Sequence, residues 1–376
     1  MDHRSIILIS GVLLLLMTAT VALESLKRRN LGIDASVLEV CRSRLRVWWI
    51  LFGSLICVLL IGTVATVFFF GLISFWAMRE YITLTPTRPA DHKTLFGVFF
   101  IWTPLQFILV GFDSEWFRSV FGIGTYSVYS VLLPAYAFLI LPASIAISND
   151  PKRFLERVAK IQVGLLICVY SLSYAPAILT TSLTQDAPEP NLSDVYAVGL
   201  EDKLMMPIEK ALSTPSSIVD LPVSDLSTPK TGQTPRKILT SDNLCLLVVF
   251  VVLIQLSDIF QFLWQQVFGQ HKIAPSINSN KTYEGVLLGA FSTSLIAVVL
   301  WYFTPFEFWW QPAIIGFIIS LMGFAGSITM SAIKRDRGVK NYGSLIEGHN
   351  GILDRIDSLC FAAPVFFHLV WIFLNI

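Results

Sequence analysis

The amino-acid sequence predicts an all-α, polytopic membrane protein of about nine to ten transmembrane helices. Hydrophobic residues make up 54% of the 376 positions, charged residues only 14%, and the mean hydropathy is +0.67. Soluble domains, by contrast, carry about 25% charged residues. Apolar runs long enough to cross about 30 Å of hydrocarbon recur along the chain. They fall near residues 5–23, 49–77, 95–112, 120–147, 163–183, 242–268, 283–303, 313–333 and 358–375.

Three features narrow the class of membrane protein. The run at residues 5–23 is predicted to be a retained helix, because it is too long for a typical signal-peptide core and no clear cleavage site follows it. The five cysteines form no CxxC motif or Cys/His cluster, so neither a zinc site nor a disulfide framework is indicated. No internal repeat is evident, which argues against an inverted-repeat transporter.

Positive charge gathers in some of the loops, and the positive-inside rule tests how the chain crosses the membrane. If the nine spans simply cross the membrane in alternating directions, the basic loops cannot all lie on the same side of it. Loops 113–119 and 304–312 are not basic, and so they are expected on the other side. The basic segments are residues 24–46, 78–94, 148–162 and 331–357.

A helical hairpin within the second apolar run resolves this conflict. If Trp49 to Met78 enters and returns as two short helices that bend near Gly62-Thr63, all basic loops lie inside and the N-terminus lies outside. The alternative is one tilted 29-residue helix, in which case the first basic loop breaks the rule. The hairpin is the favoured interpretation.

Residues 185–241 differ in composition from the rest of the chain. They contain seven prolines and many Ser and Thr residues, with little apolar periodicity, which is typical of a disordered insert. A short amphipathic helix over residues 195–212 is the only element expected there. The insert separates N-terminal transmembrane helices, residues 1–184, from a C-terminal transmembrane region, residues 242–376. The insert is expected outside.

The stretch from Ser331 to Asp357 concentrates charge between two apolar spans. Its nine charges would cost several kcal/mol each if they were buried unpaired in hydrocarbon, so we expect a water-facing, ligand-binding surface. Asp354 and Asp357 are spaced i, i+3 and share one helix face, where they could bind Mg²⁺ with phosphate oxygens. Arg355 is expected to point elsewhere, toward phosphate or Glu347. Basic residues, carboxylates and glycines together suggest nucleotide chemistry on a lipid.

A second polar region precedes this stretch. Asp258 lies within an apolar run, where an ionisable residue is a functional candidate, although a helix–helix hydrogen bond would also explain it. Further on, Thr282 can cap a helix that begins near Tyr283. Lys281 and the free N–H groups of that helix would then form an anion site. Glu284 could instead be an ordinary first-turn acid.

These residues resemble the signature of the phosphatidate cytidylyltransferase (CDP-diacylglycerol synthase) family. The chain reads S-x-x-K-R-x4-K and then G-H-x-G-x-x-D-R-x-D, and its run from His271 to Gly289 is also similar to a family motif. The similarity is close in the C-terminal third and elsewhere is one of architecture only. The matching signature residues are Ser331, Lys334, Arg335, Lys340, Gly348, His349, Gly351, Asp354, Arg355 and Asp357.

The resemblance implies nucleotidyl transfer, in which the phosphate of phosphatidate attacks the α-phosphorus of CTP to give CDP-diacylglycerol and pyrophosphate. Mg²⁺ is the expected cofactor, with Asp354, Asp357 and Asp258 as its ligands. His349 could donate a proton, bind phosphate or hold the loop in place. The implied catalytic residues are Lys334, Arg335, Lys340, His349, Arg355 and Asp357. The implied substrate-binding residues are Lys281, Thr282, Glu284, Gly285, Ser331, Gly348 and Gly351.

The expected partners are CTP, phosphatidate and membrane lipids, with a second copy of the chain as a further candidate and no nucleic acid. The resemblance also implies a bacterial inner membrane, with the active site facing the cytoplasm. Two alternatives stay open: a cytidylyltransferase that acts on another lipid phosphate, and a non-catalytic paralogue that binds anionic lipid.

The chain departs from the family pattern at four positions. Family members usually have Asp where Ser327 and Asn341 stand, Gly where Asn350 stands and Asn where Ser257 stands. Two potential metal-binding carboxylates are therefore missing. Either Asp258 and Glu284 compensate for them, or activity is reduced.

Overall fold

The computed structural model describes residues 3–29, 35–85, 87–112, 117, 124–180, 240–339 and 351–375. Within them, ten helical stretches are long and apolar enough to cross a membrane, which confirms the predicted all-α polytopic fold. Helices from both sides of the insert pack into one compact unit. Residues 185–239 of the predicted insert, with the helix expected at 195–212, lie outside the described residues, and its last two residues, Thr240 and Ser241, belong to the helix Thr240–Phe268.

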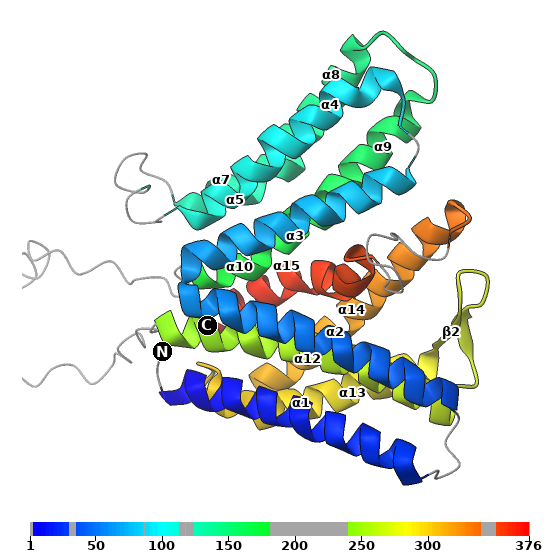
Figure 1. Ribbon diagram of the computed structural model, residues 1–376. Coiled ribbons are helices and arrows are strands. Elements are labelled where there is room, and N and C mark those ends of the chain that lie inside the picture. The colour runs from blue at the N-terminus through cyan, green and yellow to red at the C-terminus, as the bar shows by residue number, and fades with distance from the viewer. Residues whose placement is uncertain are drawn as a thin grey trace, which may run out of the picture. The chain divides into compact units, whose positions relative to one another are not determined.

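The spans follow one another along the chain (Figure 1). Several of them are interrupted by π-helical turns. Pro104 and Pro134 lie at or just after two of these turns, where a missing N–H disturbs the regular ladder. The first three spans are single helices: α1 (His3–Arg29), α2 (Ala35–Ile61) and α3 (Thr63–Leu84). The fourth span consists of η1 (Pro89–Asp91), α4 (His92–Gly97), η2 (Val98–Trp102) and α5 (Thr103–Gly111). The fifth consists of α7 (Thr125–Val131), η3 (Leu132–Ala137) and α8 (Phe138–Ile147), and the sixth of α9 (Phe154–Leu165), η4 (Leu166–Ser171) and α10 (Leu172–Thr180).

The C-terminal spans carry the predicted functional residues. A small antiparallel β-hairpin, which the sequence did not predict, joins the first two of them and pairs Lys272 with Thr282. These elements are α12 (Thr240–Phe268), β1 (Lys272–Ala274), β2 (Asn278–Thr282), α13 (Tyr283–Val299), η7 (Leu300–Phe303), α14 (Trp310–Asp336) and α15 (Leu353–Asn375).

The second apolar run forms two helices, as the hairpin interpretation predicted. Gly62 separates α2 from α3 and has a φ of 134°, a backbone conformation that side-chain-bearing residues rarely adopt. The single tilted helix is therefore wrong. The two helices are not short, however, because their apolar parts span 21 and 22 residues, enough for each to cross the membrane.

The basic segments meet at one end of the helices, where ion pairs connect three of the four, residues 78–94, 148–162 and 331–357. Arg157 at the start of α9 donates to both carboxylate oxygens of Asp91, and both side chains are buried. Arg88 donates to Asp150 at 2.8 Å, a hydrogen bond that lowers the pKa of that carboxyl group. Arg337 at the end of α14 lies 3.8 Å from a carboxylate oxygen of Glu156. We refer to this end of the helices, which also carries the β-hairpin, as the basic end.

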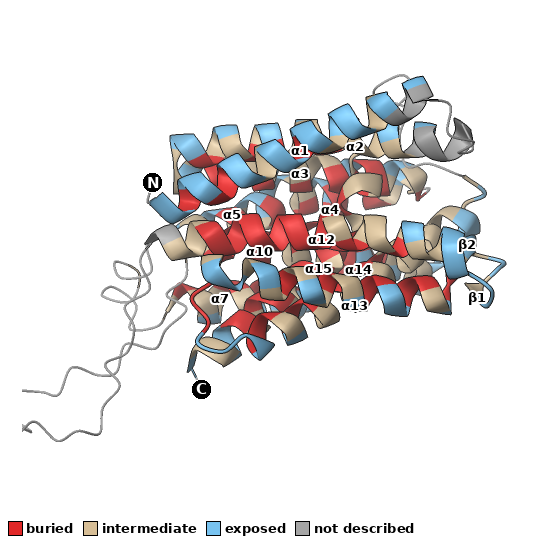
Figure 2. Ribbon diagram, turned by 90° about the horizontal axis from the view of Figure 1, so that it is seen from below, coloured by how far each residue is buried: buried red, intermediate tan, exposed pale blue. Residues whose placement is uncertain are grey.

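The opposite end carries an aromatic belt. Trp301, Tyr302, Trp309 and Trp310 are exposed around loop 304–312, as is typical of a membrane–water interface. Between the two ends, α1 and α2 present exposed apolar residues outward while α12 is largely buried (Figure 2). This distribution is that of a lipid-facing surface around a packed core.

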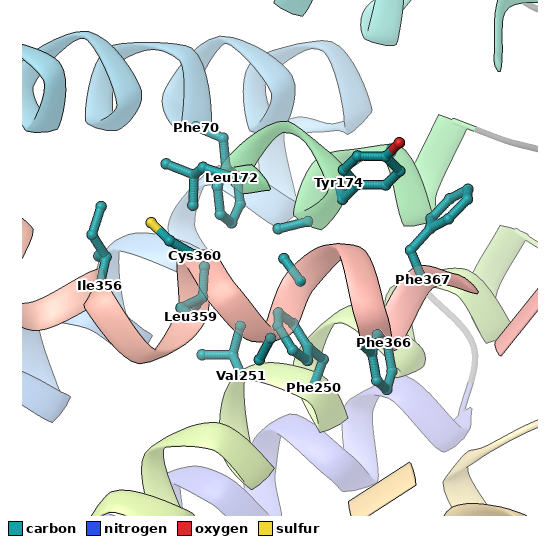
Figure 3. Close-up of a cluster of buried hydrophobic side chains, with 14 of the residues drawn as sticks. Phe70, Leu172, Tyr174, Phe250, Val251, Ile356, Leu359, Cys360, Phe366 and Phe367 are labelled. Atoms are coloured by element: carbon teal, nitrogen blue, oxygen red, sulfur yellow. The ribbon is translucent and has the colours of Figure 1, made fainter. Parts of the chain in front are cut away.

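The core fixes α15, the helix that carries the end of the signature. Phe366 of α15 stacks on Phe250 of α12 at 4.6 Å between ring centroids. Phe367 packs edge-on against Tyr174 of α10, and Cys360 is completely buried (Figure 3). Because α15 packs against α10, α12 and α14, its first turn is held firmly at the basic end.

Candidate active site

A polar cavity of about 470 Å³ lies at the basic end, where five elements meet. Its charged lining comprises four cations and three carboxylates, which is unusual among membrane-spanning helices. The lining residues are Ser43, Arg44, Val47 and Trp48 of α2; Gln255, Asp258, Phe262 and Gln265 of α12; Asn278, Asn280 and Lys281 of β2; Ser327, Ser331 and Lys334 of α14; and Asp354, Arg355, Asp357 and Ser358 of α15.

Seven of the predicted site residues line this cavity, although they come from four separate elements. Arg355 is among them, so it faces the same cavity as the two carboxylates beside it rather than pointing elsewhere. Its suggested partner Glu347 lies outside the described residues, as do Lys340, Gly348 and His349. The seven are Asp258, Lys281, Ser331, Lys334, Asp354, Arg355 and Asp357.

Two of the carboxylates are held side by side by one serine. The Ser358 hydroxyl lies 3.0 Å from Oδ1 of Asp258 and 3.4 Å from Oδ1 of Asp357. The Ser358 backbone N–H also donates to Asp357 at 2.8 Å. Within the described residues neither carboxylate forms an ion pair. Two negative charges placed so closely repel each other, and a cation between them would relieve that repulsion.

The third carboxylate is engaged differently. Asp354 accepts a 2.7 Å hydrogen bond from Nζ of Lys334, so the first turn of α15 is tied to the last turns of α14. In the described part of the chain no three His, Cys, Asp or Glu side chains converge as a complete metal site. The Asp258–Asp357 pair nevertheless fits Mg²⁺, which usually takes one or two protein carboxylates together with substrate phosphates.

Lys281 enters the cavity from β2. Its ammonium donates to Oε1 of Gln261 at 3.1 Å and lies 5.7 Å from the centre of the Phe324 ring. Burial lowers the pKa of this ammonium, and the negative charge of Asp258 opposes the shift. Gln261 in turn donates to Ser257 and Ser320, so that a chain of hydrogen bonds links Lys281 to α12 and α14.

The close approach of α14 to α15 depends on Gly326. A Cβ atom at this position would lie 2.5 Å from the backbone oxygen of Asp357 and 3.0 Å from the Phe361 ring. A larger residue would therefore push apart the two helices that carry Lys334 and Asp357.

The remaining predicted residues of the hairpin region support the site without lining the cavity. Thr282 caps α13 as expected, since its Oγ1 accepts from the Gly285 N–H at 3.2 Å. Glu284 accepts from the backbone N–H groups of Gln270 and His271 instead of facing the cavity. It is therefore not placed to replace a missing metal ligand.

Two signature residues also lie apart from the main cavity. Arg335 donates through Nε to the Ile277 carbonyl at 3.2 Å and lines a smaller adjoining pocket of about 190 Å³. Gly351 is buried just ahead of α15.

Glu80 of α3 is a residue that the sequence analysis missed. Its side chain is only 4% exposed and accepts hydrogen bonds from the backbone N–H groups of Ile352 at 3.0 Å and Leu353 at 2.8 Å. These are N–H groups that the start of a helix leaves unpaired. A residue far away in sequence thus caps the helix that carries Asp354 and Asp357. The only signal was an acid near the end of an apolar run.

The structure also places two of the departures from the family pattern. Ser257 forms a buried 2.5 Å hydrogen bond with Ser320 and so links α12 to α14. Ser327 lines the cavity, so the position where the family pattern described above has an aspartate faces the same space as Asp357. Asn341 and Asn350 lie outside the described residues.

The chain is similar in sequence to a known protein family. The family model described as "Cytidylyltransferase family" matches residues 42–373. The chain is 30% identical over 333 residues to a protein named "Uncharacterized protein YnbB" of Escherichia coli (strain K12), covering 87% of this chain and 86% of that protein.

Phosphatidate cytidylyltransferases of two staphylococci are similar over a shorter region. The Staphylococcus haemolyticus (strain JCSC1435) enzyme is 33% identical and the Staphylococcus aureus (strain COL) enzyme 35% identical, each over 126 residues. These matches cover 33% of this chain and 48% of each enzyme. The family match, by contrast, includes α3 and every residue that lines the cavity. The protein therefore belongs to the cytidylyltransferase family.

Proposed function

We propose that the protein is a CTP-dependent cytidylyltransferase that converts phosphatidate and CTP to CDP-diacylglycerol and pyrophosphate. The observation that carries this proposal is the cavity at the basic end, where four cations surround two adjacent carboxylates that lack an ion-pair partner among the described residues. Two polyanionic substrates must approach each other in this reaction, so the main task is to neutralise charge and align the groups in line.

The chain's own residues suit that task. Lys281, Lys334 and Arg355 place positive charge around one space, and charge-assisted hydrogen bonds to phosphate are stronger than neutral ones. The attacking phosphate oxygen is already ionised at neutral pH, so no strong general base is required. A new P–O bond forms at the α-phosphorus of CTP as the bond to pyrophosphate breaks.

Mg²⁺ is the cofactor that we propose for this reaction. Asp258 and Asp357 would hold it, while Asp354 orients Lys334. When bound, the ion would supply charge neutralisation at the phosphates. Asp258 is a better candidate than Glu284 for the second Mg²⁺ ligand, because the Glu284 carboxylate already accepts hydrogen bonds from backbone N–H groups.

The direct test is release of pyrophosphate by purified protein supplied with CTP, Mg²⁺ and phosphatidate. We expect turnover that requires all three, and a strong decrease in Asp354→Ala because Lys334 loses its carboxylate partner. Absence of turnover in the wild type, or unchanged turnover in Asp354→Ala, would contradict the catalytic proposal.

Because of Ser327, the same assay should also be run with other lipid phosphates. It replaces a carboxylate inside the cavity and changes the charge that a substrate meets there. Turnover with a polyprenyl phosphate or an ether-lipid phosphate, but not with phosphatidate, would identify a cytidylyltransferase with a different lipid substrate.

We also propose that the basic end faces the cytoplasm of a bacterial inner membrane, because loops rich in Lys and Arg stay on that side. Ser279 in the hairpin and Glu307 in the opposite loop are both exposed. In a variant with Cys41 and Cys57 replaced by serine, an impermeant thiol reagent should label Ser279→Cys only after permeabilisation. It should label Glu307→Cys in intact cells. The reverse pattern would overturn the orientation.

A further inference from the structure

The wall of the cavity that α2 contributes differs from the wall formed by the signature. Arg44 and Trp48 are spaced i, i+4 and therefore share one face of α2. Asp258 and Phe262 have the same spacing on α12, and the Arg44 guanidinium lies 5.0 Å from the centre of the Phe262 ring. Val47 adds a further apolar contact surface. This wall therefore combines one cation with large apolar side chains.

The hydrogen bonding of Arg44 leaves it able to bind an anion. Nη1 donates to the backbone oxygen of Asp258 at 3.4 Å, which is a long contact. Within the described part of the chain no carboxylate forms an ion pair with Arg44. A guanidinium carries five N–H donors in a planar fork that matches phosphate oxygens. Most of its donors are thus available on the cavity side of α2.

A second part of the cavity lining, which β2 and α14 contribute, has a different character. Asn278 and Ser331 lie there with Lys334, and the Asn278 amide is within 3.5 Å of the Ser331 hydroxyl. This wall is polar, with donors and acceptors suited to a nucleotide. A phospholipid headgroup instead requires a cation for its phosphate beside apolar surface for its glycerol and acyl chains.

We propose that the wall formed by Arg44, Val47, Trp48 and Phe262 is the subsite for the lipid phosphate, with Arg44 binding the phosphate oxygens. This proposal rests on the cytidylyltransferase function proposed above. The two substrates would then bind to different parts of the lining of one cavity, which also contains the Asp258–Asp357 pair. Arg44 belongs to no part of the signature, which runs from Ser331 to Asp357.

The test compares Arg44→Ala with Arg46→Ala. Arg46 lies on the same helix two residues further on, on a different face, and is exposed. We expect Arg44→Ala to raise the KM for the lipid phosphate by roughly 10- to 100-fold, the range of a charge-assisted hydrogen bond, with the KM for CTP changed less than about twofold. Arg44→Lys should recover part of the loss, and Arg46→Ala should match the wild type. Equal behaviour of the two alanine variants, or an equal rise in both KM values, would overturn the proposal.

A binding measurement separates failure of this inference from failure of the proposed function. Native mass spectrometry of the detergent-solubilised full chain would compare retention of phosphatidate with that of phosphatidylcholine. We expect preferential retention of phosphatidate by the wild type and Arg46→Ala, and loss of that preference in Arg44→Ala. Retention dependent on Arg44 without any CTP-dependent turnover would keep the lipid subsite and reject the transferase. Turnover with retention unaffected in Arg44→Ala would keep the transferase and reject the subsite.

Discussion

Asp357→Asn is expected to lower CTP-dependent turnover by at least roughly 100-fold, since even residues that only orient metal ligands typically contribute 10- to 100-fold. Asparagine keeps an oxygen that can accept from the Ser358 N–H, so the start of α15 should retain its geometry. It removes the negative charge that, with Asp258, would hold Mg²⁺. The measurement is pyrophosphate release as a function of Mg²⁺ concentration, and the half-saturating concentration should rise as the rate falls.

Asp336→Asn is the matched control for this variant. Asp336 is the last residue of α14, its side chain is 70% exposed, and it does not line the cavity. Its substitution should leave the rate and the Mg²⁺ dependence unchanged. If Asp357→Asn behaved like Asp336→Asn, the assignment of Asp357 to the metal would have to be abandoned.

Arg157→Met is expected to destabilise the protein by about 3–5 kcal/mol, because removal of one partner of a buried ion pair leaves the other charge uncompensated. Arg157 is 5% exposed and Asp91 1% exposed, and Nε of Arg157 donates to Oδ1 of Asp91 at 2.9 Å. Arg157 also donates to the backbone oxygen of Asp150 at 2.6 Å. Thermal unfolding of the detergent-solubilised protein should show a clearly lower Tm.

Two further variants test whether an uncompensated buried charge causes the loss of stability. Arg153→Ala, at a side chain that is 76% exposed and 3.9 Å from Glu156, should change the Tm little. Adding Asp91→Asn to Arg157→Met should recover part of the lost stability, because no charge is then left buried alone. A double variant less stable than Arg157→Met would show that the uncompensated charge is not the cause.

The parts of this fold that depend on local composition could be predicted from sequence. Apolar runs located the spans, and loop charge located the break at Gly62 even though each helix proved longer than expected. The Thr282 cap followed from residue type alone. The β-hairpin was missed because its strands are only 3 and 5 residues long and lack a clear alternating pattern.

From the sequence, the site residues could be identified where charged residues cluster along the chain, but not how they are arranged in space. The convergence of Asp258 with Asp357 rests on helix packing across 100 positions of sequence, so spacing could identify the carboxylates but not show which two lie together. Spacing alone paired Asp354 with Asp357, whereas in the structure Asp354 is bound to Lys334. Arg44 was only one charge in a basic loop until tertiary contacts placed it beside Asp258.

The hydrogen bonds between Glu80 and the start of α15 limit which parts of the chain could be exchanged with a relative. The two N–H groups that open the signature helix are satisfied by an acid 272 and 273 positions earlier. Similarity to the staphylococcal enzymes nevertheless extends over only 126 residues of the chain. An exchange of C-terminal regions between relatives would transfer the recognisable motif without the side chain that completes its first turn. The catalytic unit is therefore larger than the motif that reveals it.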